Sequence, residues 1–145
     1  MIAGIADRLR AAVPALVTVR GVVDLASMVD GKVRHALPAA FVHVQADQDQ
    51  GTLDWSQQVQ IVARQIGVLV AVGGVGEDRG QDQGDTLQAV LDAGRTALLG
   101  FVPDGAREAL TFAGGDLVRV GGGTVLWLDA WRTSFLLTSE AASNG

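Results

Sequence analysis

Residues 57–72, QQVQIVARQIGVLVAV, constrain the fold of this chain more than any other segment. Apolar side chains recur there at every second position, a period that predicts a β-strand. From Ile66 onward both faces are apolar, which is typical of a strand buried on both sides. Residues 57–65 are instead rich in glutamine and arginine. Such a strand would be roughly 50 Å long, so we expect residues 66–72 in the core and residues 57–65 as a projecting edge or arm.

Two segments carry apolar residues at helical spacing. Ile2, Ile5, Leu9 and Val13 predict a first helix over residues 2–13, which ends before Pro14. Asp85 is followed three residues later by Gln88, a pattern that predicts a capping box at the start of a helix. The apolar positions from Leu87 to Phe101 then continue this second helix.

Shorter strands are expected on both sides of the long one. Residues 16–23 are β-branched and predict a strand interrupted at Gly21, followed by a helical turn over residues 24–28. Residues 39–45 alternate and should pair antiparallel with the long strand, because the connection over residues 46–56 is too short for a parallel crossover. Residues 30–38 are expected to form a loop.

The C-terminal part predicts a hairpin. Strands over residues 117–120 and 124–138 are joined by a triplet of glycines, and a break is expected near Asp129. A long connection with a short turn at residues 107–111 should precede them. The element order gives an α+β fold of two layers, with an antiparallel or mixed sheet, two helices packed on one face and an extended β-arm. We expect a single domain over residues 1–138 and a disordered tail over residues 139–145.

Composition limits the possible functions. The chain of 145 residues has no cysteine, so disulfides and thiolate metal sites are excluded. A net charge of -5 with scattered basic residues argues against a surface that binds nucleic acid. The most apolar run is about half as long as the roughly 20 residues of a membrane-spanning helix.

No motif predicts catalysis, a cofactor or a metal. The glycine-rich loop over residues 73–84 lies between a strand and a helix, but it lacks the lysine of a P-loop and the glycine spacing of a dinucleotide site. Asp47 and Asp49 begin a calcium-like pattern that residues 51 and 58 do not continue. His35 and His43 have no second ligand at a suitable spacing. A small-ligand-binding or enzymatic domain that uses loop 73–84 stays open as an alternative.

The tryptophans divide into two classes. Trp127 is expected in the core, whereas Trp55 lies next to the polar half of the long strand, where an exposed aromatic side chain marks an interface. The candidate residues for contacts with other subunits or partners are those of the arm and of the glycine-rich loop: Trp55, Gln57, Val59, Ile61, Arg64, Glu77, Asp78 and Arg79.

Over nearly its whole length the chain resembles a known family. The segments IAGIADRLRAAVP, PAAFVHV, QQVQIVARQIGVLVAV, LQAVLDAGRTALLGFVP and TVLWLDAWRTSFLL resemble, in this order, the small tail-terminator proteins of tailed bacteriophages. The ending ALLGFVPDG of the second helix and the tryptophan-bearing last strand carry the resemblance furthest. Loop 73–84 and residues 21–36 depart from the family pattern.

The resemblance implies a virion protein without catalytic residues or cofactors. Its subunits would assemble in the host cytoplasm into a ring of six at the head-proximal end of the tail. The ring would contact the tail tube protein and the head–tail connector protein, and DNA would pass through its lumen without specific binding. The alternative within the same particle is another head–tail completion protein or a tail tube protein.

Overall fold

The computed structural model describes residues 1–21, 36–56, 58–73, 80–121 and 123–139, and for residues 80–82 the backbone alone. Within them the elements are α1 (Ile2–Ala12), β1 (Thr18–Gly21), β2 (Ala39–Asp54), β3 (Val59–Gly73), α2 (Gly80–Leu98), β4 (Thr111–Gly121) and β5 (Thr124–Thr138). The strands form one five-stranded sheet in the order β1-β2-β3-β5-β4. β1 is parallel to β2, and the other neighbours are antiparallel. The predicted α+β class with a mixed sheet is therefore confirmed.

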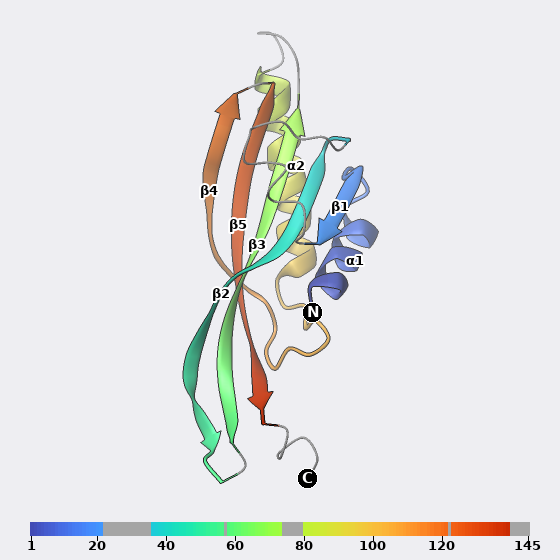
Figure 1. Cartoon of the computed structure of the whole chain (residues 1–145). Coiled ribbons are helices and arrows are strands. Elements are labelled where there is room, and N and C mark those ends of the chain that lie inside the picture. Colours follow the sequence, from blue (N-terminus) through green and yellow to red (C-terminus); the bar gives the residue numbers. More distant parts are fainter. Residues whose placement is uncertain (22–35, 57, 74–79, 122, 140–145) are drawn as a thin grey trace.

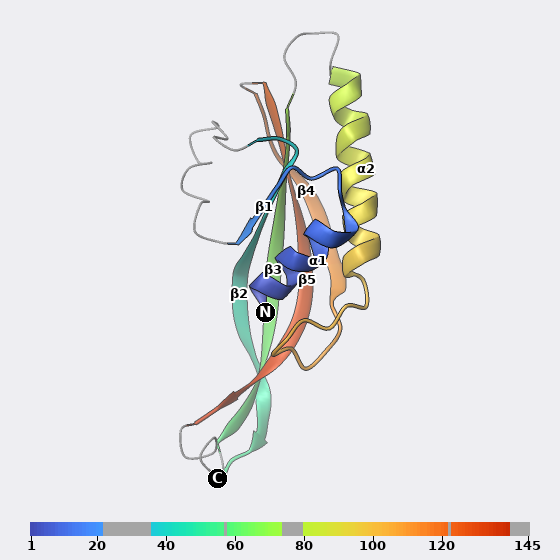
Figure 2. The same ribbon diagram turned by 90° about the vertical axis from the view of Figure 1, so that its right-hand side faces the viewer.

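Both helices lie on the same face of the sheet (Figure 2). On α1, Ile5 and Leu9 are one turn apart and both are buried, which places them on the stripe that faces the core. The sheet contributes the alternate residues of β3, and α2 contributes its own apolar stripe. The residues shared by this main core include Ile66, Val68, Val70, Val72, Val90, Leu91, Leu98 and Trp131.

The other face of the sheet holds a second, smaller core. Its buried members are Ala39, Phe41, Leu69, Ala71 and Leu126. The intervening residues of β3 therefore point to this face while their neighbours point to the helices. The prediction that residues 66–72 form a strand buried on both sides is confirmed.

β3 is the central strand from Val59 to Ala71, so the predicted edge at residues 57–65 is wrong for residues 59–65. Val59 pairs with Asp54 of β2 and with Thr138 of β5, and β3 lies between these two strands as far as Ala71, which pairs with Ala39 and Leu126. The reason is that β2 does not end at residue 45, as the connection predicted over residues 46–56 required. Its polar residues 46–54 continue to pair with β3, through register shifts after Val44 and Asp49.

Other boundaries also differ from the predictions. α2 begins at Gly80, five residues before the predicted cap at Asp85. β4 begins at Thr111 and β5 runs through Asp129 without a break. Outside the described residues lie the predicted turn at residues 24–28, residues 30–35 of the loop predicted at 30–38, residues 74–79 of loop 73–84 and the tail from residue 140.

Candidate functional site: a three-stranded arm

Three strands of the sheet continue beyond the helical layer as a twisted ribbon (Figures 1 and 2). We call this ribbon the arm and define it as residues 47–54 of β2, 59–65 of β3 and 132–138 of β5. Both helices lie beside the other half of the sheet, and the connection between α2 and β4 covers only the base of the arm, where Thr133 and Ser134 are buried. The arm is thus the part of the described chain that is shaped most clearly for contact with another molecule.

Arg64 joins the three strands of the arm. Its Nε and Nη2 donate hydrogen bonds to Oδ1 and Oδ2 of Asp47 on β2, at 2.8 and 2.9 Å. The guanidinium also lies 4.4 Å from the ring centroid of Phe135 on β5. Its hydrogen bonds lower the pKa of Asp47 and raise the pKa of Arg64 itself. The side chain proposed as a partner contact is therefore already engaged within its own subunit.

The far end of the arm is held by local hydrogen bonds. Oδ1 of Asp54 accepts from the backbone N–H of Ser56 at 2.9 Å and from its hydroxyl at 2.7 Å. Oδ1 of Asp49 accepts from the N–H of Gly51 at 2.8 Å and from Nε2 of Gln60 at 2.7 Å, and these bonds lower the pKa of Asp49. Gly51 has φ +116°, a conformation that favours glycine. These hydrogen bonds order the far end of the arm around Asp49 and Asp54.

Large apolar side chains are exposed at this far end of the arm. We call them the arm tip: Leu53, Trp55, Leu136 and Leu137. Trp55 is 83% exposed, although tryptophan is normally a well-buried residue. Beside it lies an open groove of about 460 Å³, lined by Thr52, Trp55, Gln58, Gln60, Leu137, Thr138 and Ser139.

The predicted contact residues do not form one site. Trp55 lies at the arm tip, and Val59 and Ile61 are half-buried on the arm face directed away from the helices. Gln57, Glu77, Asp78 and Arg79 lie outside the described residues. Loop 73–84 starts where β3 ends at Gly73, at the opposite end of the strand from Val59. Partner contacts at the arm and at this loop would therefore be separate.

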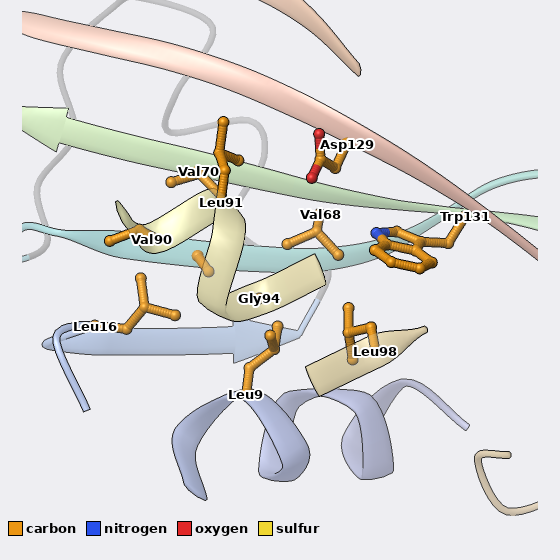
Figure 3. A pocket seen from close by; sticks show the side chains of 11 residues that line it. Leu9, Leu16, Val68, Val70, Val90, Leu91, Gly94, Leu98, Asp129 and Trp131 are labelled. Carbon is orange, nitrogen blue, oxygen red and sulfur yellow. The ribbon is translucent and has the colours of Figure 1, made fainter. Parts of the chain in front are cut away.

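The cavity between the helices and the sheet is too small for a cofactor. The cavity between the helices and the sheet holds about 20 Å³, space for about one water molecule, whereas small-molecule pockets hold about 300 to 1,000 Å³. Figure 3 shows its apolar lining, with Asp129 and Trp131 projecting from β5 beside Gly94 and Leu98. Among the described residues there is no group of three potential metal ligands.

Asp129 belongs to a polar contact that the sequence analysis missed. It accepts two hydrogen bonds from Arg95 of α2 and one from Trp127, which was predicted in the core and is only partly buried against it. The available signal was an acidic residue at an inward position of an otherwise apolar strand, which requires a buried donor. From the sequence, a break in the strand was expected at this position instead.

Comparisons with known proteins agree with this architecture. The chain matches the family model of the phage tail terminator protein over residues 2–142. Among solved structures it is similar to a chain of the virion of a native gene transfer agent particle, with a TM-score of 0.56, 17% identity and 92% of each chain covered. At this identity the likeness shows the fold alone. No curated protein matches the sequence, and no described helix is long and apolar enough to cross a membrane.

The family match extends over nearly the whole chain, as the resemblance did. It confirms a structural protein of the virion tail, and the family is not an enzyme class. The chain belongs to the phage tail terminator protein family.

Proposed function

We propose that this chain ends the growth of the tail tube by closing into a ring, of six subunits, on the head-proximal end of the finished tube. The ring then presents the surface that joins the tail to the head connector. The observation that carries this proposal is the family match over residues 2–142, combined with an arm that projects beyond the helical layer. The tail tube protein and the connector protein are the proposed partners.

The edges of the sheet support assembly. Beyond Val42, β2 pairs with no further strand on its outer side among the described residues, and β4 has none along its outer edge. Strand edges of this kind are templates for contact with other chains unless they are protected. Two unlike edges on one subunit allow a head-to-tail contact, and such a contact gives a ring when its rotation closes.

Charge supports passage of DNA through such a ring. The chain carries a net charge of -5, and a surface of like sign to the phosphates does not retain DNA. We therefore propose a lumen through which DNA passes without specific binding. The same argument assigns no nucleic-acid-binding residue to the chain.

The test is to add the purified chain to growing tail tubes. We expect mass measurement in solution to find a single closed oligomer, and electron microscopy to show one extra ring on tubes whose growth has stopped. Unlimited polymerisation of the chain by itself would identify a tube protein instead. A monomer that leaves tube growth unchanged would contradict the proposal.

A further inference from the structure

We draw no further inference here: the strongest candidate, the exposed apolar arm tip with the open groove beside Trp55, carries no proposal because nothing in the structure shows what covers it.

Discussion

Arg95 of α2 donates two hydrogen bonds to Asp129 of β5, from Nε to Oδ2 at 2.9 Å and from Nη2 to Oδ1 at 2.8 Å. Nε1 of Trp127 donates a third, to Oδ1 at 2.8 Å. The guanidinium also lies 4.7 Å from the ring centroid of Phe112, so it contacts β4 as well. The side chain of Asp129 is 5% exposed. This polar contact therefore fixes α2 to the sheet at one defined position.

Removal of Arg95 should destabilise the fold strongly. In Arg95→Met the carboxylate of Asp129 stays buried and keeps only the Trp127 hydrogen bond, so we expect the free energy of unfolding to fall by about 3 kcal/mol. Urea unfolding followed by circular dichroism measures this change. The double variant Arg95→Met/Asp129→Leu should lose less than Arg95→Met, because it leaves no unpaired charge in the core.

Gly115 should not tolerate a side chain. A Cβ atom there would lie 2.7 Å from Oδ1 of Asp129 and 3.0 Å from Nη2 of Arg95, so Gly115→Ala must displace the ion pair. We expect a loss of about 1 to 3 kcal/mol in the free energy of unfolding. Gly84→Ala is the matched control: nothing lies within 4 Å of that position on α2, so alanine should stabilise the helix by up to about 1 kcal/mol. Equal effects of the two substitutions would contradict this account.

Acidification should destabilise the protein through His43. Burial lowers the pKa of this histidine, more strongly than a backbone hydrogen bond at Phe41 raises it. Below the ordinary histidine pKa of about 6.5, the unfolded chain binds the proton and the folded chain resists it, so stability falls as the pH decreases from 7.5 to 5.5. Unfolding in urea at several pH values measures the slope.

Substitution identifies the histidine responsible for this slope. His43→Gln should flatten it, whereas His35→Gln, at the other histidine, should retain it. The lowered pKa values of Asp47 and Asp49 act only at lower pH, because their contribution is complete above the ordinary aspartate pKa of about 4. A steep slope that survives in His43→Gln would exclude His43 as its origin.

Two neighbouring hydroxyls on β5 should respond in opposite ways. Oγ1 of Thr133 donates to the carbonyl of Glu108 at 2.6 Å, so Thr133→Val should cost about 1 kcal/mol. Ser134 is fully buried, and its Oγ has no hydrogen-bond partner among the described residues. Ser134→Ala should therefore be neutral or slightly stabilising. Thermal unfolding of both variants compares them, and a destabilised Ser134→Ala would indicate a partner for that hydroxyl.

Arg64 should stiffen the arm without holding the core together. In Arg64→Ala the contacts with Asp47 and Phe135 are lost, so we expect faster amide hydrogen exchange in residues 47–54 and unchanged exchange in residues 66–72. Arg10→Ala removes the exposed pair with Asp7 and should leave arm exchange unchanged. Accelerated exchange throughout the sheet would instead show that Arg64 supports the whole fold.

The local spacing of apolar residues was sufficient to predict several helices and strands. The heptad-like spacing of Ile2, Ile5 and Leu9 predicted α1, and the two-sided apolar run after Ile66 predicted the core strand. These predictions hold because a buried face imposes its own period on the sequence. The family resemblance supplied the structural role in the virion tail, which periodicity could not.

Contacts between neighbouring strands, and not the local spacing of apolar residues, determine the structure of residues 46–54. Residues 46–54 lack apolar alternation, and they form a strand because Asp47, Asp49 and their neighbours find partners such as Arg64 and Gln60 on β3. That pairing turns residues 59–65 from an expected edge into the centre of the arm. By itself the sequence determined which residues avoid water; the tertiary structure decided which polar groups satisfy one another, because such partners lie far apart in the chain and no local period records them.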